Sequence, residues 1–147
     1  MAERTESSIE VAAEAAAVLD VIADFPAYPE WAEQVREATV LGEDGDGWAD
    51  EVEFVLDTGV IKDRYVLSYD WDVDEVGAGV VSWRLVRSEM LKALDGSYTI
   101  TPKGDGTAVT YRLAVDVKLP MLGLIKRKAE KMIIDTALKA LKRRVEG

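Results

Sequence analysis

The chain of 147 residues has the size of one ordinary domain, and 48% hydrophobic and 31% charged residues are typical of a folded, soluble protein. No stretch reaches the ~18 to 20 consecutive apolar residues of a membrane-spanning helix, and residues 1–6 lack the features of a secretory signal, so we expect a cytoplasmic protein. The absence of cysteine and histidine excludes disulfides, thiolate chemistry and the commonest metal ligands, while the net charge of −10 argues against nucleic acid as a partner.

The first predicted elements are a strand and two short helices. Residues 3–11 include an alternation of polar and apolar side chains with a period of two, which predicts a strand. Residues 12–23 are rich in alanine and place apolar side chains at three- and four-residue spacing, which is typical of an amphipathic helix. Pro26 and Pro29 end that helix. Residues 28–31 should then form a short helical turn whose two aromatic side chains fold back onto the domain.

Six further strands are predicted between residues 35 and 118. Their ranges are 35–42, 48–57, 61–73, 79–88, 93–102 and 107–118. Short loops rich in glycine and aspartate, such as Asp-Gly-Asp-Gly at 44–47, join most of them. Such loops indicate antiparallel hairpins, so the strands should form a meander. The connection near residues 90–92 lacks glycine and is the least regular.

One face of the predicted sheet is apolar and the other is charged. Alternation along the strands places these aromatic side chains on the apolar face: Phe54, Tyr65, Tyr69, Trp71, Trp83, Tyr98 and Tyr111. The charged face carries arginines, including Arg64 and Arg112, which we expect to pair with acids on neighbouring strands rather than to hold a ligand carboxylate. A sheet with one apolar face needs a covering layer.

The covering layer is predicted to be a long helix over residues 121–145. One apolar stripe of this helix is expected to face the sheet, and it consists of Ile125, Ala129, Met132, Ile133, Thr136 and Ala140. Residues 121–147 hold eight bases and three acids, a balance of +5, which leaves −15 for residues 1–120. We interpret the bases as the solvated side of an amphipathic helix. Peripheral contact with an anionic membrane is an alternative that this interpretation does not favour.

The order of strand, two short helices, six strands and long helix resembles the START-like, helix-grip (SRPBCC) superfamily. The segment Asp-Phe-Pro-Ala-Tyr-Pro-Glu-Trp at 24–31 points to its bacterial polyketide cyclase/dehydrase-like and coenzyme-Q-binding-like branch. The resemblance implies a single α+β domain over residues 1–147, in which a curved, seven-stranded antiparallel sheet wraps around the C-terminal helix. Such proteins bind lipids, sterols, polyketides or quinones, and a minority catalyse ring closure or dehydration.

The resemblance also implies a cavity between the sheet and the C-terminal helix that holds a small hydrophobic ligand. Its expected lining is Phe54, Tyr65, Tyr69, Trp71, Trp83, Tyr98, Tyr111, Ala129, Met132, Ile133 and Thr136. The alternative for these aromatics is that they only fill the space between sheet and helix. A ligand-binding protein is our first hypothesis. A polyketide cyclase or dehydratase is the second, and a module that modulates a macromolecular partner is the third.

No catalytic residue, metal site or cofactor is predicted. The absence of histidine and cysteine favours binding over catalysis, although holding a reactive chain in a dry pocket can itself accelerate ring closure. The acidic residues lack the spacing of a calcium loop. The glycine-rich turn at 42–47 lacks the Lys and Ser/Thr that contact phosphate groups, so it is interpreted as a hairpin turn.

Overall fold

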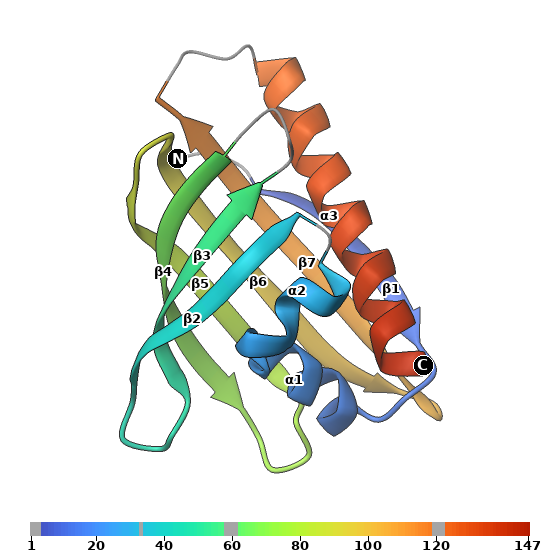
Figure 1. Cartoon of the computed structure of the whole chain (residues 1–147). Helices are drawn as coiled ribbons and strands as arrows, with labels where there is room; N and C mark the ends of the chain where they lie inside the picture. The colour runs from blue at the N-terminus through green and yellow to red at the C-terminus, as the bar shows by residue number, and fades with distance from the viewer. Residues whose placement is uncertain (1–3, 33, 58–61, 119–122) are drawn as a thin grey trace.

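Seven antiparallel strands form one curved sheet (Figure 1). The structure is a computed structural model that describes residues 4–32, 34–57, 62–118 and 123–147. The strands are β1 (Thr5–Val11), β2 (Val35–Glu43), β3 (Ala49–Asp57), β4 (Lys62–Val73), β5 (Gly79–Ser88), β6 (Leu91–Lys103) and β7 (Gly106–Val117). Their order in the sheet is β1-β7-β6-β5-β4-β3-β2, a meander to which the first strand is added beside the last. The predicted strands and their antiparallel pairing are confirmed.

Side chains at the tight connections between strands accept hydrogen bonds from the backbone of the turns. In the β2–β3 loop, Asp44 Oδ1 accepts hydrogen bonds from the backbone N–H groups of Asp46 and Trp48, at 2.8 and 3.0 Å. The connection between β5 and β6 has no glycine. There Ser88 Oγ accepts the N–H groups of Met90 and Leu91 at 3.1 and 2.9 Å, so a serine side chain satisfies the backbone of the turn.

The helical segments gather over the apolar face of the sheet. They are α1 (Ala15–Ala23), the 3-10 turn η1 (Phe25–Ala27), α2 (Tyr28–Trp31) and α3 (Gly123–Glu146). Figure 1 shows α3 lying along β1 and β7, whereas η1 and α2 lie against β2. Residues 28–31 were predicted to form a short helical turn whose aromatic side chains fold back onto the domain. This is confirmed, since they form α2, Tyr28 is buried and its ring contacts that of Trp31. Within the described ranges, none of the helices is both long and apolar enough to cross a membrane.

The face of α3 that packs on the protein differs from the predicted one. Of the predicted stripe, Ala140 is buried, but Ala129, Met132, Ile133 and Thr136 are exposed, Met132 by 69% and Ile133 by 44%. The side chain of Ile125 lies outside the described part of the helix. The buried residues are instead Glu130, Ile134, Leu138, Ala140 and Leu141. The prediction was wrong because α3 carries two neighbouring apolar stripes, and a glutamate interrupts the one that is buried.

Glu130 explains how that second stripe packs. Its side chain is buried, and it accepts hydrogen bonds from Thr5 Oγ1 and from the backbone N–H of Val115, each at 2.7 Å. The pairing of β1 with β7 begins at Thr5 and Leu113, so Val115 lies beyond the residues that β1 reaches. The Glu130 carboxylate therefore takes the place of a missing strand partner and fastens α3 to the sheet.

Candidate functional site

Aromatic rings cover the concave face of the sheet from β3 to β7. The strand register sets Phe54 opposite Tyr65, Tyr69 opposite Trp83, and Tyr98 opposite Tyr111. The ring centroids of these pairs lie 5.4, 5.7 and 4.7 Å apart. The seven aromatic residues that the sequence placed on one face therefore do lie together. We call this set the aromatic floor: Phe54, Tyr65, Tyr69, Trp71, Trp83, Tyr98 and Tyr111.

The short helices close one end of the aromatic floor. Phe25 of η1 is fully buried, and its ring centroid lies 5.0 Å from that of Tyr69, 6.0 Å from Phe54 and 6.1 Å from Trp71. Trp71 also donates its indole N–H to the carbonyl of Ala49 at 2.7 Å. Phe54, Tyr69 and Trp71 thus have packing roles within the core. The rings of Tyr65, Trp83, Tyr98 and Tyr111 continue the floor beyond the contacts of Phe25.

A glycine makes room for the largest ring of the floor. Trp83 on β5 pairs with Gly96 on β6. A Cβ atom placed on Gly96 would lie 2.6 Å from two carbon atoms of the Trp83 indole, well inside van der Waals contact. The indole therefore lies across the backbone of Gly96, where any side chain would displace it. Its ring also contacts those of Tyr98 and Tyr111, at 5.2 and 5.6 Å.

Four tyrosine hydroxyls on the floor have no hydrogen-bond partner among the described residues. Among the residues that the structure describes, those of Tyr65, Tyr69, Tyr98 and Tyr111 make no hydrogen bond, whereas Tyr28 donates to the carbonyl of Ile22 at 2.5 Å. Yet in this described part of the chain, no fully buried side-chain nitrogen or oxygen is left without a partner. The four hydroxyls therefore border space large enough for a solvent molecule, although their rings are largely buried.

These phenols are neutral at physiological pH. Burial is the main cause that raises the pKa of Tyr65, Tyr69, Tyr98 and Tyr111 above the usual value near 10, and neighbouring tyrosines or Asp63 raise it further. A neutral phenol both donates and accepts a hydrogen bond, but it is a poor base. The floor can therefore bind or polarise an oxygen atom of a ligand.

We expect none of the five tyrosines to ionise near pH 10 while the protein is folded, because burial raises the pKa of each. Above about pH 10 the unfolded chain releases phenolic protons that the folded chain keeps, so stability falls as the pH rises through that value and is unaffected by these groups below it. An alkaline titration followed by phenolate absorbance, with urea unfolding at about pH 9 and about pH 11, measures both effects. A reversible phenolate signal near pH 10 in the folded state would contradict this assignment.

Asp63 is a buried carboxylate beside the aromatic floor that the sequence prediction missed. It lies on β4 two positions before Tyr65, on the same face of the strand, and it is 6% exposed. Its Oδ2 accepts the hydroxyl of Ser88 at 2.7 Å, and its Oδ1 accepts the N–H of Arg64 at 2.8 Å. The sequence does contain the information that Asp63 points inward, since alternation along the strand places it on the same face as Tyr65. A charged residue at an inward strand position indicates a special role.

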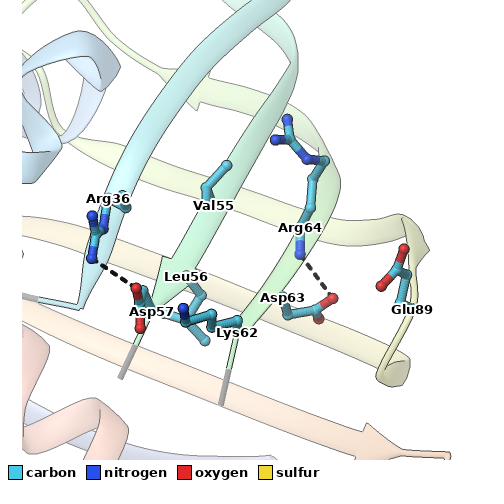
Figure 2. A pocket seen from close by; sticks show the side chains of 8 residues that line it. All are labelled: Arg36, Val55, Leu56, Asp57, Lys62, Asp63, Arg64 and Glu89. Carbon is cyan, nitrogen blue, oxygen red and sulfur yellow. Dashed lines mark hydrogen bonds and ion pairs between the residues drawn. The ribbon is translucent and has the colours of Figure 1, made fainter. Parts of the chain in front are cut away.

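Asp63 also borders a depression of about 410 Å³ where β3 ends and β4 begins (Figure 2). Its lining is Arg36, Val55, Leu56, Asp57, Lys62, Asp63, Arg64 and Glu89. Figure 2 shows Arg36 ion-paired with Asp57, at 2.7 Å. Arg64 pairs with Glu53 on the neighbouring strand at 2.7 Å, which confirms the predicted cross-strand pairing for this arginine. The two arginines of the lining are thus already paired with carboxylates.

A second depression, of about 480 Å³, lies beside the start of β7. It is lined by Glu10, Val11, Ala12, Lys103, Gly104, Gly106, Thr107 and Lys142. Lys103 pairs with Glu10, and Lys142 donates to the backbone carbonyl of Glu10. Neither depression includes a residue of the aromatic floor, so the floor, with four hydroxyls that have no partner in the described ranges, is a separate feature and is the candidate site.

Comparison with known families finds a match over nearly the whole chain. Residues 2–146 match the family described as "Polyketide cyclase / dehydrase and lipid transport". A search of curated proteins finds no match.

Solved structures share the fold at low sequence identity. A START superfamily protein from Mycobacterium smegmatis is similar with a TM-score of 0.90 and 23% identity, over 99% of this chain and 98% of that one. The Zhui aromatase/cyclase from Streptomyces sp. R1128 has a TM-score of 0.72 and 15% identity, over 97% and 93% of the two chains. A STAR-related lipid transfer protein from Xanthomonas axonopodis has a TM-score of 0.72 and 20% identity, over 97% and 85%.

Proposed function

Since the chain belongs to the polyketide cyclase/dehydrase and lipid transport family, of the START-like helix-grip superfamily, we propose that it binds one small hydrophobic ligand over the aromatic floor. The ligand would lie between the sheet and α3, in contact with Tyr65, Trp83, Tyr98 and Tyr111. The observation that carries this proposal is the group of tyrosine hydroxyls that make no hydrogen bond to the residues the structure describes. Residues 1–147 are proposed to form one domain, because one sheet and one core account for the described residues.

The chemistry of the interior supports a neutral, oxygen-bearing ligand. The buried polar residues in the described part of the chain are Asp63, Ser97, Thr107 and Glu130, and none of them is basic. A buried anion without a cationic partner is strongly disfavoured, and these two carboxylates would repel it further. Phenolic hydroxyls instead suit the carbonyl or hydroxyl oxygens of a ligand. We therefore favour a quinone or a polyketide-like molecule over a fatty acid anion.

A polyketide cyclase or dehydratase activity is the second candidate. It is supported by the same hydroxyls, because a neutral phenol that donates to a carbonyl oxygen stabilises the negative charge that develops there during enolisation. On this hypothesis Tyr98 and Tyr111 polarise the carbonyl, and the aromatic floor holds the chain in a folded shape. Native mass spectrometry of protein from its own host identifies a molecule that co-purifies with it. Adding this molecule to the protein then distinguishes the two functions, since a carrier leaves it unchanged and an enzyme converts it.

The double variant Tyr98→Phe/Tyr111→Phe is expected to weaken binding of an oxygenated aromatic probe, a fluorescent flavonol, by roughly 5- to 160-fold. That factor corresponds to two hydrogen bonds of about 0.5–1.5 kcal/mol each. Binding of a hydrocarbon probe without oxygen atoms, such as diphenylhexatriene, should stay nearly unchanged, because both rings remain. Fluorescence titration measures both affinities, and an equal loss for the two probes would contradict the proposed role of the hydroxyls.

Tyr28→Phe is the matched control for this experiment. The Tyr28 hydroxyl donates to the carbonyl of Ile22 inside the core, so its removal should lower the free energy of unfolding by about 1 kcal/mol and leave probe binding intact. The floor variant should show the opposite pattern, since its hydroxyls have no partner in the described structure. If the native protein bound neither probe, the proposal of a ligand site over the floor would be wrong.

A further inference from the structure

The side of α3 that faces away from the protein combines cations with apolar side chains. With 100° of rotation per residue, Lys128, Met132, Lys139 and Arg143 project opposite to the buried Ile134 and Leu141, and all four are exposed. Ile133, 44% exposed, lies on the adjoining flank. We call these five residues the outer face of α3. This is the side on which the sequence wrongly predicted burial, so apolar residues that were assigned to the core lie instead at the surface.

Each acid of α3 accepts a hydrogen bond from another residue of the protein. Glu130 is buried against β1 and β7. Asp135 accepts Lys131 at 3.0 Å, while Glu146 accepts Lys142 at 2.7 Å and the backbone N–H of Ala12 at 2.9 Å. Lys131 and Lys142 are also bonded to β1, to Ser7 Oγ and to the carbonyl of Glu10. Charges on the β1 side of α3 are therefore neutralised within the protein.

The cations of the outer face make no ion pair with the described residues, although the charge of Lys139 contributes to lowering the pKa of Asp135 one turn earlier. In the described parts of the chain, no ion pair joins Lys128, Lys139 or Arg143 to a carboxylate. Met132 is 69% exposed between them. Cations around exposed apolar side chains, on one side of a helix, are the composition of a helix that lies at the surface of an anionic bilayer.

We propose that the outer face of α3 docks on the surface of an anionic lipid membrane. A second copy of the chain fits this face poorly, because a twofold contact would bring like charges together. The charge of −15 on residues 1–120 opposes approach to an anionic surface by the rest of the molecule, so binding is helix-first. In this orientation Met132 enters the headgroup region while Lys128, Lys139 and Arg143 meet lipid phosphates.

The test is sedimentation of the native protein with vesicles of phosphatidylcholine alone or of phosphatidylcholine with phosphatidylglycerol. Binding is expected only with the anionic vesicles, and it should fall steeply as salt is added. The variant Lys128→Glu/Lys139→Glu/Arg143→Glu should lower the partition coefficient by roughly a hundredfold or more, from about fivefold per base near such a surface. Met132→Ser, which leaves the charge unchanged, should lower it by roughly fivefold.

Arg84→Glu/Arg87→Glu/Lys92→Glu is the matched control. These residues are exposed on β5 and β6, and the variant changes the net charge by the same amount as the helix variant. It should bind nearly as well as the native protein, and thermal melts should show all variants folded. Equal sedimentation with both kinds of vesicle, or an equal loss in the control, would overturn the proposal. Binding to polyglutamate without binding to vesicles would also overturn it, in favour of an acidic protein partner.

Discussion

Phe25→Ala is expected to lower the free energy of unfolding by about 3–5 kcal/mol. Phe25 is fully buried, and its ring contacts those of Tyr28, Phe54, Tyr69 and Trp71. Truncation removes the ring that joins η1 to the aromatic floor and leaves a cavity that these four rigid rings can only partly fill. Urea unfolding followed by circular dichroism gives the change in free energy.

Two control variants separate loss of volume from loss of a particular residue. Phe25→Leu retains most of the buried volume, so it should cost much less than the alanine variant. Leu41→Ala shortens a side chain that is 46% exposed, and it should change stability by no more than about 0.5 kcal/mol. A loss below about 1 kcal/mol for Phe25→Ala would mean that η1 does not close this end of the floor.

Gly96→Val is expected to destabilise the protein by about 3 kcal/mol and to abolish binding of the flavonol probe. The new Cβ would lie 2.6 Å from the Trp83 indole, and the two methyl groups would add to this overlap. The indole must leave its position across β6, and it would then disturb its ring contacts with Tyr98 and Tyr111. Near-ultraviolet circular dichroism reports the displaced indole, and probe titration reports the site.

Gly42→Val is the control for a new side chain in a strand. Gly42 lies in β2, and a Cβ placed there meets no atom within 4 Å. Valine is also favoured in strands, so this variant should be as stable as the native protein or more so. If Gly96→Val were equally well tolerated, the Trp83 indole would have another position available. The position of the indole across Gly96 would then not be needed for stability or for probe binding.

The sheet and the aromatic floor were predictable because alternation is a local property. A strand turns successive side chains to opposite faces, so Tyr65, Tyr69 and Trp83 were placed correctly from their spacing alone. The hairpin loops also encode their turns locally, as in the hydrogen bonds that Asp44 accepts. Asp63 obeys the same alternation, but it was overlooked because a carboxylate was not expected on the apolar face.

The buried face of α3 was not predictable in this way. Its sequence contains one stripe with Met132 and Ile133 and another with Ile134 and Leu138, and hydropathy favours neither clearly. Burial of the second stripe depends on Glu130, whose hydrogen bonds come from Thr5 and Val115, more than a hundred residues apart in the chain. A charge at that position counts against burial unless its distant donors are known.

The sequence by itself determined the order of the elements, the antiparallel pairing, the two faces of the sheet and the excess of bases near the C-terminus, since each depends on neighbours within a few residues. Tertiary structure alone decided which side of α3 is buried, which tyrosine hydroxyls have no partner among the described residues, and which cations form ion pairs. Those three properties depend on atoms brought together from distant parts of the chain, because a hydrogen bond or an ion pair requires its partner at a defined distance. The candidate site and the outer face of α3 are both of this second kind.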